Sequence, residues 1–323
     1  MKTLAYDIFR TTEQAAMAAW PLLGCGNKNL IDGVAVSAMR EALNQMIMQG
    51  SIVIGEGEID HAPMLYIGEQ LGAGGPPVDI AVDPIEGTRM VAMGQANALA
   101  VIAFAPRGML LHAPDMYMRK LVVGAQAKGS IDLRQSLADN LRCVAAKLGK
   151  SLNELRMITL DKPRHQQAIE QANALGVKVY AIADGDVAAS LMTCLSNSQV
   201  DVMYCIGGAP EGVISACAIR ALGGDMQAEL IDFCQAKGES VANREIAIME
   251  YQRCQQMGVN INQVYSLTEL VRSEQIIFSA TGITQGDIVT GIKERNGGQL
   301  QTQTLLINGL DNTCNIINSL HYR

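Results

Sequence analysis

Aromatic residues are scarce in this chain of 323 residues: they make up 4% of it, and Trp20 is the only tryptophan. Proteins that bind nucleic-acid bases by stacking need several aromatic side chains, so the scarcity argues against such a surface. A surplus of positive charge is missing as well, because the formal net charge is −7. We therefore expect no nucleic-acid partner, and an anionic substrate would need bound cations or a local group of basic residues.

The motifs of several common enzyme classes are missing too. The four histidines are never four residues apart, and neither G-x-S-x-G nor G-x-x-x-x-G-K-[ST] occurs. These absences argue against zinc proteases of the H-E-x-x-H type, serine hydrolases and P-loop nucleotidases. The eight cysteines form no C-x-x-C pair, a pattern typical of reduced thiols in a cytosolic protein.

Long apolar runs are also lacking. One of the longest, residues 98–106, is much shorter than the roughly 20 residues of a membrane-spanning helix. The first seven residues have no apolar segment of a signal peptide, so we expect a cytoplasmic protein without a membrane partner. Hydrophobic residues nevertheless make up 49% of the chain, enough to bury a core in one large or two ordinary domains.

The most informative stretch is 78–88, Val-Asp-Ile-Ala-Val-Asp-Pro-Ile-Glu-Gly-Thr. Its β-branched residues predict a buried strand that ends at Asp83, because Pro84 fixes φ and removes a backbone donor. Glu86 adds a second carboxylate after the turn, and Thr88 adds a hydroxyl before a predicted helical turn. Carboxylates at a strand end suit Mg²⁺ or Mn²⁺. For a lone motif of this kind, a proline turn with a solvated glutamate is the alternative.

Two further acidic segments precede this stretch. Asp32 opens a helical pattern and is either an N-cap or a ligand close to Lys28. The segment 55–60, Gly-Glu-Gly-Glu-Ile-Asp, places acids at three of its positions, with Glu56 between two glycines. Such a density is costly without a cation, and the alternative is an acidic surface turn.

Residues after 160 alternate between predicted strands and helices, which indicates βαβ units and a largely parallel region. Lys162 and Arg164 lie at a predicted helix start, where they either bind a phosphate or form an exposed basic pair. Asp184 and Asp186 flank a glycine before the next helix. Helix capping explains one of these two carboxylates but not both.

A turn at 207–212 follows the buried strand 200–206 and repeats the combination of proline, glutamate and glycine. It predicts Glu211 at a strand end and Gly208 where the backbone can approach a substrate. Tyr117 has the shape of a substrate contact, although most tyrosines in such segments only pack.

Helical spacing predicts a first helix over residues 3–22, with Thr11, Thr12 and Glu13 exposed and Trp20 directed inward. The apolar run 98–105 predicts a strand that pairs with residues 79–83.

Taken together, these segments resemble the class II, bacterial-type fructose-1,6-bisphosphatases, within the lithium-sensitive, metal-dependent sugar phosphatases. The resemblance covers nearly the whole chain and rests on residues 27–33, 55–58, 83–88, 113–117, 162–165, 184–186 and 207–212. It implies a layered α/β (α+β) fold, the αβαβα five-layer sandwich, in a homodimer or homotetramer. We expect a metal-binding half at 1–155 and a half that contacts the sugar phosphate at 156–323.

The resemblance also implies the reaction and its residues. Two or more Mn²⁺ or Mg²⁺ ions would support hydrolysis of fructose 1,6-bisphosphate to fructose 6-phosphate and phosphate by a metal-activated water, a gluconeogenic step. The implied metal ligands are Asp32, Glu56, Asp83, the Ile85 carbonyl, Glu86 and Glu211. The implied catalytic residues are Thr88, which would orient or activate the water, Glu56 and Asp83. The implied substrate contacts are Lys28, Glu86, Gly87, Thr88, Tyr117, Lys162, Pro163, Arg164, Asp184, Gly185, Asp186 and Gly208.

Three alternatives share parts of this pattern. A sedoheptulose-1,7-bisphosphatase or an inositol monophosphatase would keep the metal ligands and differ in the sugar contacts. A non-catalytic sugar-phosphate binding protein would keep the fold, although the intact acid set and Thr88 argue against it. Residues 223–243 match no motif, and their role is not assigned.

Overall fold

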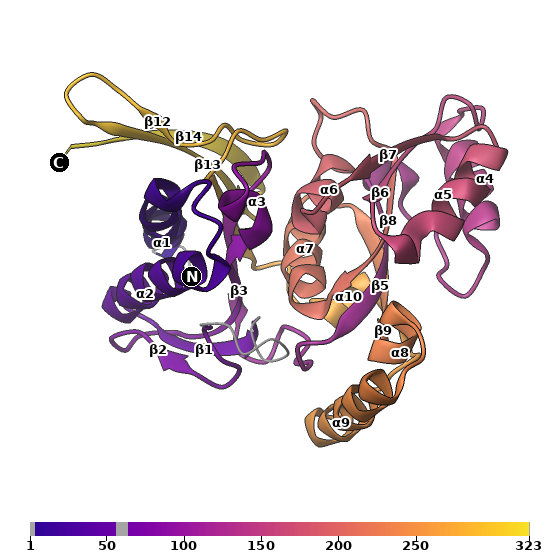
Figure 1. The fold of residues 1–323 in the computed structure, drawn as a ribbon, viewed down its shortest axis with the longest axis horizontal. Helices are drawn as coiled ribbons and strands as arrows, with labels where there is room; N and C mark the ends of the chain where they lie inside the picture. Colours follow the sequence, from indigo (N-terminus) through magenta and orange to yellow (C-terminus); the bar gives the residue numbers. More distant parts are fainter. Residues whose placement is uncertain (1–3, 56–63, 323) are drawn as a thin grey trace. The chain divides into compact units, whose positions relative to one another are not determined.

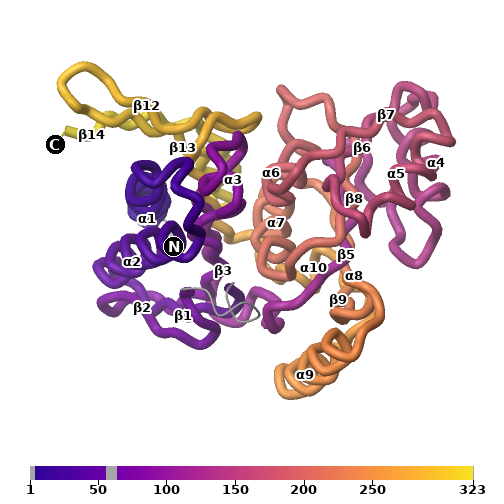
Figure 2. Tube along the Cα trace, viewed as in Figure 1, coloured from indigo at the N-terminus to yellow at the C-terminus, as the bar shows by residue number. Residues whose placement is uncertain are grey.

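The computed structural model describes residues 4–55 and 64–322. The chain divides into two compact units, the first made of Met1–Leu110 with Ser273–Arg323 and the second of Leu111–Arg272. Figures 1 and 2 show the C-terminal strands, in yellow, next to the N-terminal helices of the first unit, in indigo. The predicted boundary between residues 155 and 156 falls inside the second unit. The last part of the chain, which was predicted to belong to the second half, returns to the first sheet.

A mostly antiparallel sheet forms the centre of the first unit. Its eight described strands have the order β12-β13-β11-β4-β3-β1-β2, with β14 paired to β13. Their bounds are β1 Gln49–Ile54, β2 Gln70–Leu71, β3 Pro77–Glu86, β4 Leu99–Pro106, β11 Ile277–Gly282, β12 Lys293–Glu294, β13 Leu300–Asn308 and β14 Thr313–His321. The predicted pairing of 79–83 with 98–105 is confirmed, since Asp79 pairs with Ala105 and Asp83 with Val101.

β3 continues to Glu86 rather than ending at Asp83, so the predicted stop at Pro84 is wrong. The register between β3 and β4 shifts between Asp83 and Glu86. A bulge of this kind accommodates a residue that has no backbone N–H to donate.

The helices of the first unit pack on one face of its sheet. They are α1 Leu4–Ala19, η1 Trp20–Leu22, α2 Lys28–Gln45 and α3 Thr88–Ala92. Apolar residues at every second position of the strands, such as Ile80 and Val82 of β3, join Ile8 of α1 and Met39 of α2 in one buried core. The alternation in β3 that predicted a strand therefore also selects the face on which the helices lie.

The prediction that Thr11, Thr12 and Glu13 are exposed is wrong. All three are at most 1% exposed, because α1 turns them toward the sheet. The Thr12 hydroxyl lies 2.7 Å from the Ser279 hydroxyl, and Glu13 accepts a hydrogen bond of 2.7 Å from the Thr302 hydroxyl. Hydroxyls of β11 and β13 thus satisfy polar groups that would otherwise be costly to bury.

The second unit is built on a six-stranded mixed sheet. Its strand order is β10-β9-β5-β8-β6-β7, with bounds β5 Tyr117–Val123, β6 Arg156–Leu160, β7 Lys178–Ile182, β8 Val202–Gly208, β9 Asp225–Ile231 and β10 Val264–Ser266. β6 is parallel to β7 and β8, but β5 is antiparallel to β8 and β9, and β9 to β10. The predicted largely parallel region is therefore wrong for three of the five strand pairings of this sheet, two of which involve β5, inserted between β8 and β9.

Helices cover both faces of the second sheet. They are η2 Ala125–Ala127, α4 Leu137–Leu148, η3 Pro163–His165, α5 Gln166–Ala174, α6 Asp186–Met192, α7 Ala209–Ala221, α8 Phe233–Lys237, α9 Val241–Met257 and α10 Leu267–Leu270. Leu121 and Val123 of β5 share a core with Leu141 of α4 and Ala172 of α5. Lys120 points to the other face, toward Gly212 of α7. The predicted layered α/β fold is confirmed.

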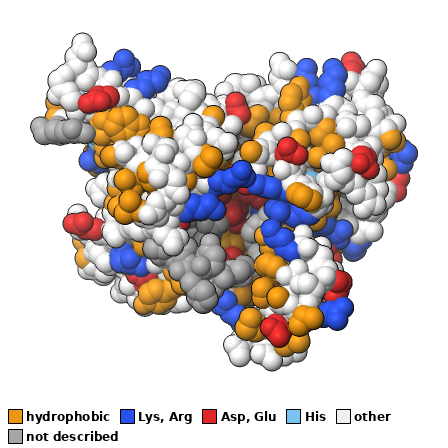
Figure 3. Space-filling view, in the orientation of Figure 1, with side chains coloured by type: hydrophobic (Ala, Val, Ile, Leu, Met, Phe, Trp, Pro, Cys, Tyr) orange, Lys and Arg blue, Asp and Glu red, His pale blue; other side chains and the backbone are white. Residues whose placement is uncertain are grey.

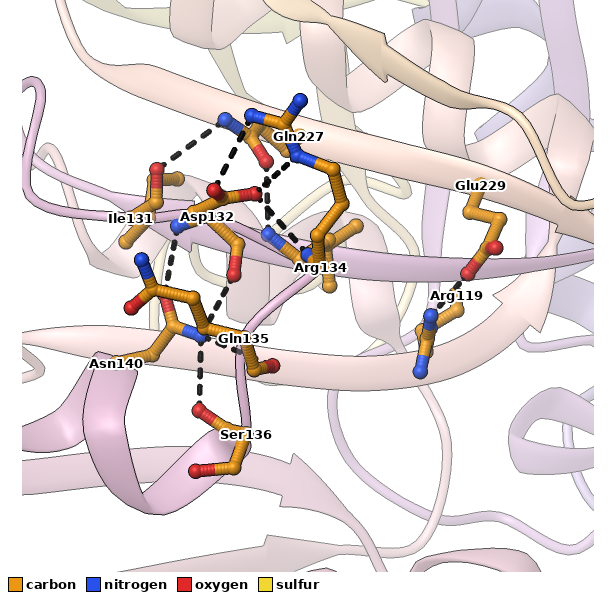
Figure 4. Close-up of polar contacts among 10 residues, drawn as sticks. Arg119, Ile131, Asp132, Arg134, Gln135, Ser136, Asn140, Gln227 and Glu229 are labelled. Atoms are coloured by element: carbon orange, nitrogen blue, oxygen red, sulfur yellow. Dashed lines mark hydrogen bonds and ion pairs between the residues drawn. The ribbon is translucent and has the colours of Figure 1, made fainter.

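A side-chain network ties the segment before α4 to β9 of this sheet (Figure 4). Gln227 of β9 accepts a hydrogen bond of 2.8 Å from the Leu133 amide and donates one of 3.1 Å to the Ile131 carbonyl. Asn140 of α4 accepts one of 2.7 Å from the Asp132 amide. These bonds hold an irregular segment without regular strand pairing.

The surface carries both charged and apolar groups. Hydrophobic side chains reach the surface over α9, in the lower part of Figure 3, and Val241, Ile248 and Met249 are more than half exposed. Within the described ranges, no helix combines the length and apolar character needed to span a membrane.

Candidate metal and substrate sites

The end of β3 brings two buried carboxylates together. Asp83 is 2% exposed and Glu86 is 4% exposed, and one carboxylate oxygen of each lies within 4.8 Å of the other. Asp83 Oδ1 also accepts a hydrogen bond of 2.9 Å from the Ile85 amide. Neighbouring buried carboxylates repel each other unless a cation compensates their charge. Because the donors are oxygen atoms, this acidic pair fits Mg²⁺ or Mn²⁺.

Thr88 begins α3 and faces a residue far away in the sequence. Gly87 precedes it with φ of 87°, in the left-handed region that favours glycine. The Thr88 hydroxyl donates a hydrogen bond of 2.7 Å to Asp32 Oδ1 and lies 3.2 Å from the Ile85 carbonyl oxygen. Since Asn27 is the N-cap of α2, the N-cap interpretation of Asp32 is wrong. Asp32 lies in the second turn of α2, with its carboxylate on Thr88.

The structure thus brings Asp32, Ile85 and Thr88 into contact and holds Asp83 and Glu86 beside each other. Glu56 lies outside the described residues. Lys28 is the exposed first residue of α2.

Glu211 lies in the first turn of α7 rather than at a strand end. Its Oε2 atom is buried and has no hydrogen-bond partner within the described ranges of the chain. A buried carboxylate oxygen without a donor is costly, and a cation would satisfy it. Gly208 is the N-cap of α7, and a Cβ atom at Gly208 would overlap the Glu211 carboxylate. Glycine at this position therefore leaves room for the Glu211 side chain.

Lys120 is a central residue of this region that the sequence analysis missed. It is completely buried, and its Nζ donates hydrogen bonds of 2.5 Å to Asp186 Oδ2 and 2.7 Å to the Gly208 carbonyl. Burial alone would lower the pKa of Lys120, but the carboxylates of Asp186 and Glu211 raise it above its ordinary value. Lys120 is thus a fixed positive charge beneath the start of α7. The sequence signal for its burial was its position on the same strand face as Met118 and Val122, which are both apolar.

The two aspartates that flank Gly185 have different environments. Asp184 forms an ion pair of 2.6 Å with Lys162, and both side chains are partly exposed. Asp186 is the first residue of α6, is 4% exposed and is bonded to Lys120. Gly185 has φ of 99° and so permits the sharp turn between them. Of the two aspartates, only Asp184 is therefore placed to meet a ligand at the surface, together with its partner Lys162.

Arg164 and Tyr117, both predicted as substrate contacts, lie together. The Arg164 guanidinium carbon lies 5.2 Å from the centre of the Tyr117 ring, within range of a cation–π interaction. Arg164 Nε donates a hydrogen bond of 2.7 Å to the Ile206 carbonyl. Pro163, predicted as a neighbouring contact, is the first residue of η3, the turn that carries Arg164.

His165 fixes the same turn to β8. It is buried, and its Nε2 accepts a hydrogen bond of 2.7 Å from the Ile206 amide. Burial, together with the nearby Arg164, lowers the pKa of His165 to about 4. The ring is consequently neutral near pH 7 and serves as an acceptor that positions Arg164.

Comparisons with known proteins agree with these arrangements. The family described as bacterial fructose-1,6-bisphosphatase, glpX-encoded, matches residues 2–321. The chain is 68% identical to fructose-1,6-bisphosphatase 2 class 2 of Escherichia coli (strain K12) over 322 residues, which cover 99% of this chain and 100% of that protein. It is 54% identical to the fructose-1,6-bisphosphatase class 2 of Haemophilus influenzae (strain ATCC 51907 / DSM 11121 / KW20 / Rd), covering 99% of this chain and 96% of that protein.

A more distant relative bears a double name. The D-fructose 1,6-bisphosphatase class 2/sedoheptulose 1,7-bisphosphatase of Parasynechococcus marenigrum (strain WH8102) is 42% identical, over 100% of this chain and 97% of that protein. All these matches run over nearly the whole length of the chain. The chain therefore belongs to the glpX-encoded, class II bacterial fructose-1,6-bisphosphatases.

Proposed function

We propose that acidic residues from several parts of the sequence hold the divalent cations with which this bisphosphatase acts. The reaction is hydrolysis of fructose 1,6-bisphosphate to fructose 6-phosphate and phosphate, a gluconeogenic step. The proposed ligands are Asp32, Asp83, Glu86 and Glu211, with Glu56 and the Ile85 carbonyl as further members. The observation that carries this proposal is the buried pair of Asp83 and Glu86, two like charges that a cation would stabilise.

Mn²⁺ or Mg²⁺, when bound, acidifies water and compensates charge on the phosphate. Thr88 then has a defined task. Its hydroxyl proton is donated to Asp32, which leaves the Thr88 oxygen free to accept a hydrogen bond from the attacking water. This orients the water toward the phosphorus atom, and orientation of that kind is a large part of catalysis.

The second unit supplies residues for the rest of the substrate. We propose that Lys162, Arg164 and Tyr117 bind the phosphate that is not cleaved, with Asp184 and Gly208 near the sugar. The ion pair between Lys162 and Asp184 supports this proposal, because it holds the partly exposed lysine at the start of the turn that carries Arg164. Binding energy from the uncleaved phosphate would orient the reacting ester.

Phosphate release from a panel of substrates with Mn²⁺ tests the function. We expect fructose 1,6-bisphosphate to give the highest kcat/KM, ahead of sedoheptulose 1,7-bisphosphate and inositol 1-phosphate. The Thr88→Ala variant should lose about 10²-fold to 10³-fold in kcat, as on removal of a group that acts in the transition state. Thr313→Ala, at the exposed start of β14, is the control and should keep full activity. Turnover unchanged in Thr88→Ala would contradict the role of this hydroxyl.

The proposal includes a cytoplasmic homodimer or homotetramer. All eight cysteines are free thiols, as expected in a reducing compartment. Size-exclusion chromatography with light scattering tests the assembly, and a monomeric mass would contradict it.

A further inference from the structure

A second cation lies on the ring of Tyr117. Lys237 Nζ is 5.3 Å from the ring centre, close to the 5.2 Å of the Arg164 guanidinium carbon. Arg164 uses its Nε for the Ile206 carbonyl. Within the described residues, neither cation has a carboxylate partner within 4.0 Å.

Each of the two cations contacts the neutral ring rather than a carboxylate in the described residues, so both are available to an anion. Their chemistry is complementary, because a guanidinium binds phosphate oxygens in a planar fork and an ammonium binds them as a point charge. The Tyr117 hydroxyl adds a hydrogen-bond donor at the end of the ring. A guanidinium, an ammonium and a phenol hydroxyl around one ring are donor types that suit a phosphate dianion.

The position of Lys237 is fixed by packing rather than by chance. Lys237 is the last residue of α8, a short helix that begins with a capping box formed by Asp232 and Gln235. Phe233 of α8 packs edge-on against Tyr117, with ring centres 5.7 Å apart. The Phe233 amide donates a hydrogen bond of 2.8 Å to Glu250. α8 is therefore held on the ring that it shares with Arg164.

Glu250 anchors this arrangement from α9. It is 5% exposed, and its second oxygen, Oε1, is buried without a hydrogen-bond partner in the described part of the chain. Burying a carboxyl group is costly. The Glu250 carboxylate is nevertheless buried and accepts the hydrogen bond of the Phe233 amide, which fixes the first residue of α8 to α9. The segment 223–243, to which the sequence assigned no role, contains this helix.

We propose that Lys237 is a specificity-determining residue that binds the uncleaved phosphate of the bisphosphate together with Arg164 and Tyr117. This inference rests on the proposed function and adds a residue to its substrate contacts. The competing explanation is that Lys237 only complements the dipole at the end of a helix. Lys147 has the same position, in the last turn of α4, with no aromatic partner in the described residues, and is therefore a matched control.

The test measures the kinetics of Lys237→Gln with two substrates and Mn²⁺. For fructose 1,6-bisphosphate we expect KM to rise about tenfold with kcat within about twofold, because a contact to a non-reacting group contributes uniform binding. For fructose 1-phosphate, which lacks the second phosphate, kcat/KM should stay unchanged. Lys237→Arg should restore most of the affinity, and Lys147→Gln should behave as the wild type with both substrates.

Binding of fructose 6-phosphate, measured by calorimetry, gives a readout that does not depend on turnover. Its Kd should rise about tenfold in Lys237→Gln, matching the change in KM. An unchanged KM and Kd would overturn the inference, as would an equal loss for both substrates, which would mean that Lys237 only supports the fold. If the wild type itself fails to hydrolyse fructose 1,6-bisphosphate, the proposed function fails instead.

Discussion

The turn between β3 and α3 and the turn between β8 and α7 are built from the same residue types. Each follows a buried strand and contains proline, glutamate and glycine before a helix. In the first turn, Gly87 comes after Glu86, so both carboxylates remain on the strand. In the second turn the helix already begins at Ala209, so Glu211 lies in the helix. A glycine follows the glutamate in both turns, and the position at which the helix begins therefore decides which element carries the carboxylate.

The two turns also differ in how their acids are compensated. Asp83 and Asp32 accept hydrogen bonds from the Ile85 amide and the Thr88 hydroxyl, which are neutral donors. Beneath the second turn, Lys120 is a permanent buried cation. Lys120 cancels part of the negative charge of Asp186 and Glu211, so the second turn depends on this lysine for its stability.

The largest expected effect follows from removing that lysine. Lys120→Met should lower the free energy of unfolding by about 3–5 kcal/mol, since it leaves Asp186 buried without its partner. Lys150→Met is the control, because Lys150 makes an equally short ion pair with Asp201 in a more exposed position, and it should cost under about 1 kcal/mol. Urea denaturation measures both. Equal losses would show that burial does not distinguish the two lysines.

Removing one acid from each turn tests whether both turns bind metal. We expect Asp83→Asn and Glu211→Gln each to lower kcat by about 10²-fold to 10³-fold, as on loss of a group that stabilises the transition state. The affinity for Mn²⁺, measured by calorimetry, should fall in both. A Glu211→Gln variant with full activity and full Mn²⁺ affinity would assign Glu211 to the support of the fold and leave the metal to the first turn.

His165, the η3 residue that is bonded to β8, should give the protein a pH-dependent stability. The pKa of His165 is lowered from 6.5 to about 4, so between these values the unfolded chain binds a proton that the folded chain does not. The contribution of His165 to the free energy of unfolding is therefore fully present above pH 6.5. It falls by up to about 3 kcal/mol as the pH drops to 4. His165→Gln, which can still accept from the Ile206 amide, should flatten this slope in urea titrations at several pH values. A slope unchanged in the variant would assign the acid sensitivity to other groups.

The smallest effects should come from the glycines, and they should differ in kind. Gly87→Ala forces a side chain into φ of 87° and should cost about 1–2 kcal/mol of stability. Gly208→Ala meets no such strain but displaces the Glu211 carboxylate, and we expect about a tenfold loss of Mn²⁺ affinity. Thermal unfolding and calorimetry on both variants separate the two outcomes. If Gly208→Ala lost only stability, Glu211 would have no role in metal binding.

Local patterns predicted the elements around the acidic residues well in the first unit and less well in the second. The strand at 78–83, its pairing with β4 and the short helix after Gly87 are present as expected. The strand end at Pro84 and the N-cap role of Asp32 were wrong. The errors have different causes: the bulge at Pro84 depends on pairing with β4, whereas the N-cap Asn27 lies five residues before Asp32 and was a local signal that the interpretation overlooked.

Polar residues inside the fold were the hardest to predict. Thr12 and Glu13 look like a solvated helix face, and Lys120 looks like a surface residue of a strand. Each is buried because a partner distant in sequence satisfies it: Ser279 and Thr302 in the first unit, and Asp186 in the second.

The sequence by itself determined the chemistry of this protein. Carboxylates, a hydroxyl and basic residues occur at fixed positions around prolines and glycines, and these local constraints need no knowledge of the remaining chain. The tertiary structure alone decided which of these groups meet, as when Asp32 of α2 accepts a hydrogen bond from Thr88 of α3. It also decided that Lys120 is a buried cation and that Lys237 shares a ring with Arg164. The physical reason is that burial and pairing depend on contacts between segments far apart in the chain, which no local pattern encodes.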